Sequence, residues 1–473
     1  MAANARRATD ESGIARYFRF AERGTDFRTE VIAGLTTFFV MAYIIFVNPA
    51  ILSGGPLATL GPSFTATLTA TCLAAGLMSI AMGLFTNYPF ALAPGLGLNA
   101  VVAFQLILSL KMPWQVAMGV IFLEGLLITL LVLTGFRTAV MNAIPLSLKR
   151  AISVGIGLFI LFIGLTNAGF VRRSPIEGGT PVELGSYTSF PVLLAAIGLL
   201  LTIVLMARRV KAALLIGIVI TTIIGIVAHY AFGADVTAAL PDVQGDLPTS
   251  LSGPDFSTIG QGINFGVFSL VGPITAVLLI FSLMLSDFFD TMGTIIGVGG
   301  QAGFVDEQGE LPGADRVLLV DSIAAGVGGA FSCSSVTTYI ESAAGVGEGG
   351  RSGLTSVVVG VLFLVSLLLA PIAGLVTSEA TAPALIIVGF LMCSVIRDIN
   401  FGELEDGLPA LLTIALMPFT YSITNGIGFG FISYVFIKVV MGKYRTIHPL
   451  LWVIALAFLI YFLIPFLQQT FGF

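Results

Sequence analysis

Long apolar segments separated by short polar connections occupy almost the whole chain. About 20 apolar residues are enough for a helix to cross a bilayer, so the pattern predicts two consecutive sets of seven membrane-spanning segments. The first set is expected at 31–52, 63–85, 90–109, 113–135, 150–170, 190–208 and 212–232. The second is expected at 266–290, 316–328, 332–346, 350–375, 380–397, 408–422 and 424–441. A last apolar run, 447–470, either crosses the membrane or lies along the bundle.

The third segment of each set is interrupted. The first begins at 87–99 with Pro89, Pro94, Gly95 and Gly97, and the second, 332–346, is too short to span as a helix. Each is expected to be a short strand followed by a half-helix. Because seven crossings reverse the direction of the chain, the two sets are expected to form an inverted repeat. The N-termini of the half-helices would then face a shared cavity near the midplane, as in membrane transporters.

Composition identifies the class of protein. The chain is 56% hydrophobic and 10% charged, with a mean hydropathy of +1.02, which is typical of an all-α polytopic membrane protein. The net charge of −5 is spread over loops and implies no nucleic-acid partner. The three cysteines have no metal-type spacing, and the two histidines, His229 and His448, lie far from the acidic stretches. We therefore expect neither a metal site nor a cofactor.

The positive charges predict the orientation. Residues 1–28 are rich in arginine and lack a cleavable signal, so they are expected to be cytoplasmic. Counting the crossings from there places most Lys and Arg residues on the cytoplasmic side, and places the long acidic connection before the second set outside. The prediction is a multi-pass protein of the inner (plasma) membrane.

Carboxyl groups inside the apolar segments are the candidate site. Asp287 and Asp290 end the apolar run 274–285, and Glu341 lies in the second interrupted segment. An acid at this depth is costly unless it is paired, hydrated or protonated, which indicates a ligand or proton site. The alternative is that such an acid only caps unwound backbone. That structural role is expected for Glu124 and Asp321.

Five stretches then reveal a resemblance to a known family. The chain resembles the adenine/guanine/hypoxanthine permeases of the nucleobase–cation symporter-2 (nucleobase–ascorbate transporter) superfamily from about residue 15 to its end. The matching stretches are FFVMAY at 38–43, APGLGLNA at 93–100, IPLSLK at 144–149, DFFDTMGT at 287–294 and TTYIESAAGV at 337–346.

The resemblance implies fourteen segments in two inverted sevens. Segments 1–4 and 8–11 would form a core domain that moves against a gate domain made of segments 5–7 and 12–14. The boundaries that follow are 1–28 for the cytoplasmic tail, 29–138 for core segments 1–4, 139–233 for gate segments 5–7, 234–264 for the external loop, 265–376 for core segments 8–11, 377–445 for gate segments 12–14 and 446–473 for an additional C-terminal hydrophobic helix.

The resemblance also implies a function and a site. It implies a proton-coupled importer of hypoxanthine, guanine and adenine, which is not an enzyme and which forms a homodimer through its gate domains in the lipid bilayer. The expected substrate-binding residues are Asn99, Asp287, Asp290 and Glu341, with Phe39, Phe90, Phe288, Tyr339 and Ile340 beside the purine rings. Asp287, Asp290 and Glu341 are also the proton-coupling candidates. The uracil branch carries a His where this chain has Thr294, so a His-linked proton step is not implied.

Other functions fit the residues less well. An anion transporter of the same architecture would need a cation or bare half-helix dipoles in the site. Here an acid occupies the tenth segment, and no Lys or Arg lies inside segments three, eight or ten. An intramembrane aspartyl protease would need an Asp where Asn99 stands. A channel would need a repeated ring of ligands. A uracil, xanthine or urate permease is the nearest alternative, and the paired aspartates favour the purines.

Overall fold

The computed structural model describes residues 13–134, 143–174, 180–186, 189–232, 253–304, 311–369 and 375–471. Residues 1–12 of the predicted tail and 233–252 of the predicted external loop lie outside the described residues. The α-helices and strands, in chain order, are α2 (Gly13–Tyr17), α3 (Phe20–Arg23), α4 (Phe27–Met41), α5 (Ile44–Ser53), α6 (Phe64–Thr86), β1 (Leu92–Pro94), α7 (Leu96–Ala100), α8 (Trp114–Leu133), α10 (Leu146–Asn167), β2 (Val171–Arg172), β3 (Glu183–Leu184), α11 (Phe190–Ala207), α12 (Ala213–Phe232), α14 (Val267–Leu270), α15 (Pro273–Gln301), α16 (Ala314–Phe331), β4 (Val336–Thr338), α17 (Ser342–Gly347), α18 (Gly353–Val365), α20 (Ser378–Met392), α21 (Leu404–Thr420), α22 (Ile423–Val440) and α23 (Pro449–Phe471).

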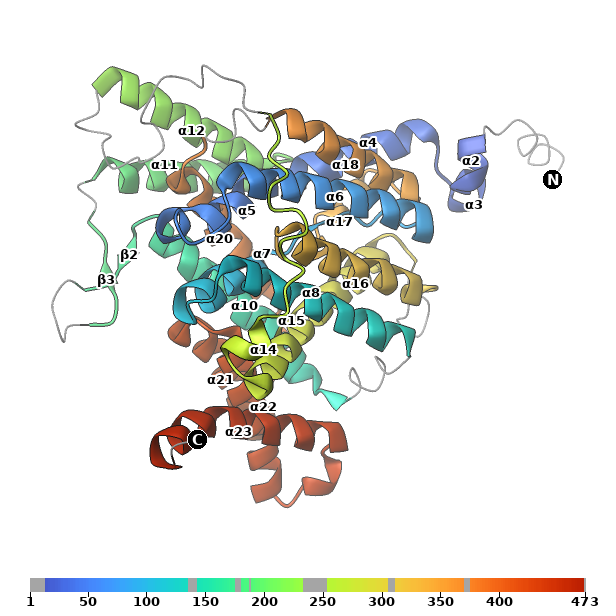
Figure 1. The fold of residues 1–473 in the computed structure, drawn as a ribbon. Coiled ribbons are helices and arrows are strands. Elements are labelled where there is room, and N and C mark those ends of the chain that lie inside the picture. The colour runs from blue at the N-terminus through green and yellow to red at the C-terminus, as the bar shows by residue number, and fades with distance from the viewer. Residues whose placement is uncertain are drawn as a thin grey trace.

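The fold is mostly helical, as Figure 1 shows. Within the described residues, nine helices are long and apolar enough to cross a membrane, and three shorter apolar helices accompany them. The chain is therefore a multi-pass membrane protein. The finer count of fourteen segments in two sevens stays a prediction.

Both interrupted segments contain a short strand followed by a helix. Strands β1 and β4 pair antiparallel, with Ala93 opposite Thr337, although they lie far apart in the sequence. Helix α7 follows β1 and continues into a π-helix, Val101–Ser109, while α17 follows β4 after a short connection. In lipid every backbone polar group needs a partner, which restricts extended backbone to sites buried within protein. The strand pair meets this condition because its burial is complete.

Serine hydroxyls form hydrogen bonds with backbone N–H and carbonyl groups in and just before β1. Ser342 Oγ accepts from the Ala91 N–H at 2.9 Å, and Ser79 Oγ accepts from the Leu92 N–H at 2.9 Å. Ser356 Oγ donates to the Phe90 carbonyl at 2.7 Å. Neighbouring helices thus hold the interrupted segment in place.

The helices pack in two groups around this strand pair. The first comprises α4, α5, α6, α8, α15, α16 and α18, and the second comprises α10, α11, α12, α20, α21 and α22. Small residues permit close approach in the first group: a Cβ built on Gly76 of α6 would lie 2.7 Å from Leu364 Cγ. Helix α10 touches α7 and α15, so it joins the two groups, and α23 packs against α22 and α15. The predicted domain boundaries stay a prediction.

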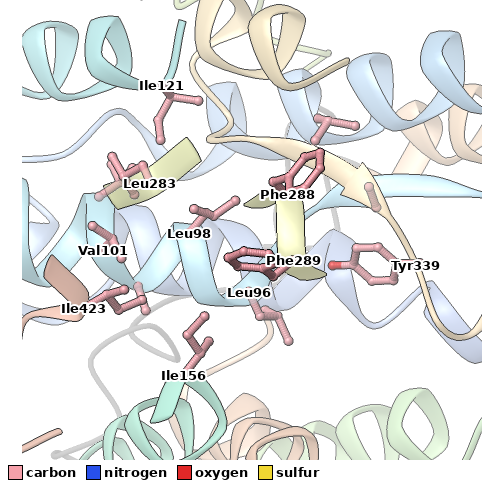
Figure 2. Close-up of a cluster of buried hydrophobic side chains, with 14 of the residues drawn as sticks. Leu96, Leu98, Val101, Ile121, Ile156, Leu283, Phe288, Phe289, Tyr339 and Ile423 are labelled. Carbon is pink, nitrogen blue, oxygen red and sulfur yellow. The ribbon is translucent and has the colours of Figure 1, made fainter. Parts of the chain in front are cut away.

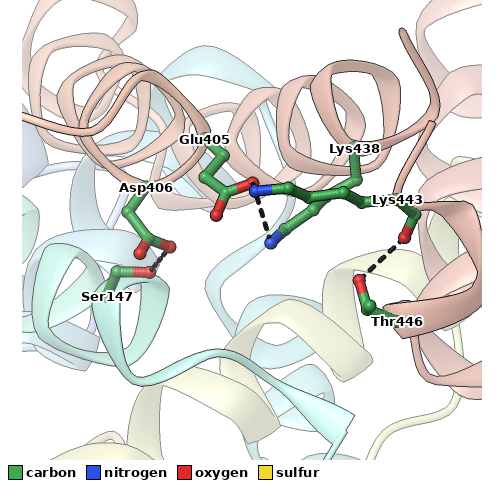
Figure 3. A network of polar contacts seen from close by, with 6 residues as sticks. All are labelled: Ser147, Glu405, Asp406, Lys438, Lys443 and Thr446. Atoms are coloured by element: carbon green, nitrogen blue, oxygen red, sulfur yellow. Dashed lines mark hydrogen bonds and ion pairs between the residues drawn. The ribbon is translucent and has the colours of Figure 1, made fainter. Parts of the chain in front are cut away.

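A polar cluster fastens one end of the second group (Figure 3). Lys438 and Lys443 both bind Glu405 Oε2, at 3.0 and 2.8 Å. Ser147 of α10 donates to Asp406 Oδ1 of α21 at 2.8 Å. The hydrogen bonds from Lys443 and then Lys438 hold the pKa of the Glu405 carboxyl below its usual range.

Candidate functional site

A cavity of about 480 Å³ lies where the two groups of helices meet. Residues from β4, α7, α15 and the β4–α17 connection line one side, and residues of α10, α20 and the turn 393–398 line the other. Its size is within the range of small-molecule pockets, about 300–1,000 Å³.

Helix α15 contributes one face to the cavity. Ser286, Phe289, Asp290, Gly293 and Thr294 line it, at the spacing expected for one side of a helix. Asp290 is the acid of this face, whereas Asp287 is not among the lining residues. Asp290 therefore reaches the cavity, and its oxygens are the acidic acceptors that α15 offers to a ligand.

The β4–α17 connection supplies the second acid. Tyr339, Ile340 and Glu341 line the cavity, and Glu341 precedes the first turn of α17. The hydroxyl of Tyr43, from the connection between α4 and α5, donates to Glu341 Oε1 at 2.6 Å. The hydroxyl of Tyr339 donates to the Pro94 carbonyl, which fixes its ring next to β1. The cavity thus receives two carboxyl groups from different segments, with a tyrosine hydroxyl bound to one of them.

The remaining walls are backbone and apolar side chains. Gly95, Leu96, Gly97 and Leu98 line the cavity at the N-terminus of α7, where helical N–H groups lack partners within the helix. On the opposite wall the second group presents mainly apolar side chains, among them Ile156. Figure 2 shows Ile156 near Leu96, with Phe289 and Tyr339 close by. A planar, partly polar ligand would meet acids and backbone on one wall and apolar surface on the other.

Several predicted site residues lie elsewhere, and their roles in binding stay predictions. Asn99 is fully buried, and neither polar atom of its side chain has a partner among the described residues. Phe90 is fully buried and stacks on Tyr88 with ring centroids 5.5 Å apart. Phe288 is buried behind the lining residue Phe289, and Phe39 lines a separate apolar groove with α12.

Asp287 is also outside the cavity lining. It is fully buried and lies beside Glu124 of α8. Asp321 of α16 accepts hydrogen bonds from the Thr338 N–H at 2.8 Å and from the hydroxyls of Thr338 and Thr291 at 2.6 and 2.8 Å. The predicted backbone-bonding role is confirmed for Asp321. It is wrong for Glu124, whose two oxygens accept no hydrogen bond from a described backbone group.

Among the lining residues that the sequence did not single out are Tyr43 and Phe289. Both lie inside stretches that carry the family resemblance, 38–43 and 287–294, and that position was the available signal. The apolar residues of α10 and α20 carried no signal, because aliphatic side chains in a spanning helix look alike whichever way they face.

Comparisons with known proteins extend these observations. The model of the Permease family, Xan_ur_permease, matches residues 28–429. The chain is 42% identical to the adenine permease AdeP of Escherichia coli over 94% of this chain and 95% of that protein. It is 40% identical to the guanine/hypoxanthine permease PbuG of Bacillus subtilis over 94% of this chain and 99% of that protein. Among solved structures, the transmembrane domain of the cyanobacterial bicarbonate transporter BicA has a similar fold, with a TM-score of 0.60 at 16% identity, covering 86% of this chain and 97% of that domain.

Proposed function

Because the chain belongs to the Permease family, we propose that it is a secondary active transporter that imports the purine nucleobases hypoxanthine, guanine and adenine by proton symport. The observation that carries this proposal is the meeting of Asp290 and Glu341 in one cavity beside Tyr339 and Phe289. The names of similar permeases, for adenine and for guanine and hypoxanthine, support the same class of substrate.

The chemistry of the cavity suits a neutral purine. A purine edge presents N–H donors next to ring-nitrogen acceptors, and an ionised carboxylate accepts two N–H bonds along such an edge. Asp290 and Glu341 would each bind donors of the base, while backbone N–H groups at the start of α7 would donate to a carbonyl or ring nitrogen. Phe289 and Tyr339 would cover the rings. An anion would meet two acids here, which disfavours an anion transporter despite the shared fold.

The position of the cavity supports alternating access. It lies between two packed groups of helices, so a movement of one group against the other would open the cavity to each side of the membrane in turn. In this proposal the first group is the core domain and the second is the gate domain. The arginine-rich N-terminus is cytoplasmic, the membrane is the plasma membrane, and the homodimer through the gate domains stays a prediction.

The test is uptake of labelled hypoxanthine by cells that express the chain. Adenine, guanine, xanthine, uracil and sulfate serve as unlabelled competitors, with and without a protonophore. Competition by adenine and guanine, together with loss of accumulation on adding the protonophore, is expected. Competition by uracil or xanthine instead would indicate a uracil or xanthine permease of the same superfamily. Competition by sulfate would favour an anion transporter.

Site variants sharpen the test. Asp290→Asn and Glu341→Gln keep the volume of the side chain but remove the negative charge, so both are expected to weaken purine binding. Glu403→Gln, at an exposed position before α21, is the matched control. Binding of labelled hypoxanthine to the purified variants measures the effect. Unchanged affinity in both site variants would contradict the assigned contacts.

A further inference from the structure

Two acids face each other inside the first group of helices, away from the cavity. Glu124 projects from α8 and Asp287 from α15, two helices that pack together. Both side chains are fully buried, and their four carboxyl oxygens accept no hydrogen bond from a donor among the described residues. The side chains of Glu124 and Asp287 nevertheless interact directly with each other.

Two buried, unpartnered acids that interact with each other favour a proton between them. Ionised carboxylates are acceptors only, so two of them bond to one another when one carries a proton. Two bare negative charges side by side in a dry interior repel each other and lose their hydration, and such pairs titrate as a unit. A shared proton removes one charge and supplies the missing donor.

The neighbouring charges favour this location for the proton. The other charged groups that act on Asp287 are acids, Asp321 of α16 and Asp290 of α15. Asp321 already accepts three hydrogen bonds from Thr338 and Thr291, and these stabilise its ionised form. Asp290 faces the cavity, where a ligand or water reaches it. Glu124 and Asp287 have neither kind of compensation.

We propose that Glu124 and Asp287 form a proton-binding site, separate from the substrate cavity, whose shared proton is the one coupled to purine transport. This assignment rests on the proposed function for its coupling, and for the proton on the packing of α8 against α15 and on the burial and missing hydrogen-bond partners of the two acids. Substrate recognition then falls to Asp290 and Glu341. A sodium ion is disfavoured as the occupant, since the pair offers few oxygens and the described residues contain no cluster of three or more metal-type ligands.

Loss of the proton would leave an additional buried negative charge between α8 and α15. Among the described residues only acids act on Asp287, so nothing basic there offsets that charge, and the deprotonated protein would rearrange slowly unless the proton returned. The proton would thereby be carried with the substrate without touching it. Only the protonation state of the pair changes in this step, and no covalent bond other than the O–H bond forms or breaks.

The closing experiment uses the purified full chain in liposomes, with Glu124→Gln and Asp287→Asn as variants and Glu403→Gln as the control. Infrared difference spectra recorded across a pH titration detect the C=O stretch of a protonated carboxyl group. The parent protein and the control are expected to show a band whose frequency and pH dependence change in both variants, because each variant removes one carboxyl group of the pair. A band with unchanged frequency and pH dependence in both variants would overturn the proton site, whether or not hypoxanthine is transported.

Transport measurements then test the coupling. A gradient of about one pH unit supports about tenfold accumulation for each coupled proton. The parent and the control are expected to reach this accumulation, and the Glu124→Gln variant is expected to fall to about the level without a gradient while hypoxanthine counterflow remains measurable. Accumulation equal to the parent's in both variants, or accumulation driven by sodium, would overturn the coupling role. If the parent shows no counterflow but the band behaves as expected, the proposed function fails and the proton site stands.

Discussion

The contact between Gly97 of α7 and Ile156 of α10 predicts how the two groups of helices close on the cavity. A Cβ built on Gly97 would lie 2.6 Å from Ile156 Cγ2, closer than real Cβ contacts allow. Glycine is therefore required where the half-helix meets the opposite wall. Gly97→Ala should push α7 and α10 apart.

The magnitude follows from the cost of overpacking, about 1–3 kcal/mol for an added methyl group in a close-packed contact. Alanine is also the better helix former, by up to about 1 kcal/mol, so the helix itself should not be weakened. Because the contact exists only where the two helices touch, the cost falls on the conformation seen here. An equilibrium between conformations would shift by roughly 5- to 150-fold, with transport rate falling accordingly.

The assay is the initial rate of hypoxanthine uptake combined with the thermal midpoint of the purified protein. Ile156→Ala removes Cγ2, so the double variant should recover most of the rate lost in Gly97→Ala, giving a coupling energy in a double-mutant cycle. Gly326→Ala is the control, because a Cβ there has no neighbour within 4 Å. An equal loss of rate in the Ile156→Ala background would refute the steric reasoning.

Three further predictions concern the framework. Asp321→Asn should lower the thermal midpoint, because hydrogen bonds to a charged group are worth about 1.5–3 kcal/mol and the amide cannot replace all three that Asp321 accepts. An unchanged midpoint would show that the hydrogen bonds from Thr338 and Thr291 are dispensable. Glu405 has a folded-state pKa below its usual range, so its stabilising effect is present above the unfolded-state pKa and is lost as pH falls through the folded one. The thermal midpoint of the parent should therefore fall more on acidification than that of Glu405→Gln, and parallel curves would contradict this. Gly360→Val should disrupt the packing of α18 on α6, because even a Cβ at this position would lie 2.6 Å from Ile80 Cγ1. Full expression of the variant, with an unchanged elution profile in detergent, would argue against that close approach.

Local chemical rules made the interrupted segments predictable from sequence. Proline and glycine limit helix formation wherever they occur, so the strand-then-helix arrangement around Pro94 needed no long-range information. The antiparallel pairing of β1 with β4 is different, because it joins two segments that lie about half the chain apart. No property of 92–94 or 336–338 alone predicts it, and the expected inverted repeat placed only the two half-helices at a shared cavity.

The orientation of individual acids was beyond the sequence. Asp287 and Asp290 are separated by only about 60° around α15, so their i, i+3 spacing predicts that both lie on one face of the helix. The packing of α8 and the opening of the cavity separate them: Asp290 lines the cavity, while Asp287 turns towards Glu124. Likewise, the bond from Tyr43 to Glu341 joins segments whose proximity no local pattern reveals.

One helix carries both an acid of the cavity and an acid of the proposed proton site, and this determines how strongly the two can communicate. Asp287 and Asp290 lie one turn apart on α15, which places their carboxyl groups about 7 Å from each other. With an effective dielectric constant of about 20, two unit charges at that distance interact by about 2 kcal/mol. A purine whose N–H groups screen the charge of Asp290 would weaken the hold of the Glu124–Asp287 pair on its proton by up to a similar amount, because a neighbouring negative charge favours the protonated form. That coupling is within the 1–3 kcal/mol typical of two binding sites, but its sign opposes joint binding of proton and purine. In the proposed symport the linkage must therefore come from the movement of the two groups of helices, which would have to favour the protonated, loaded protein over the singly occupied one, and not from the field between Asp287 and Asp290.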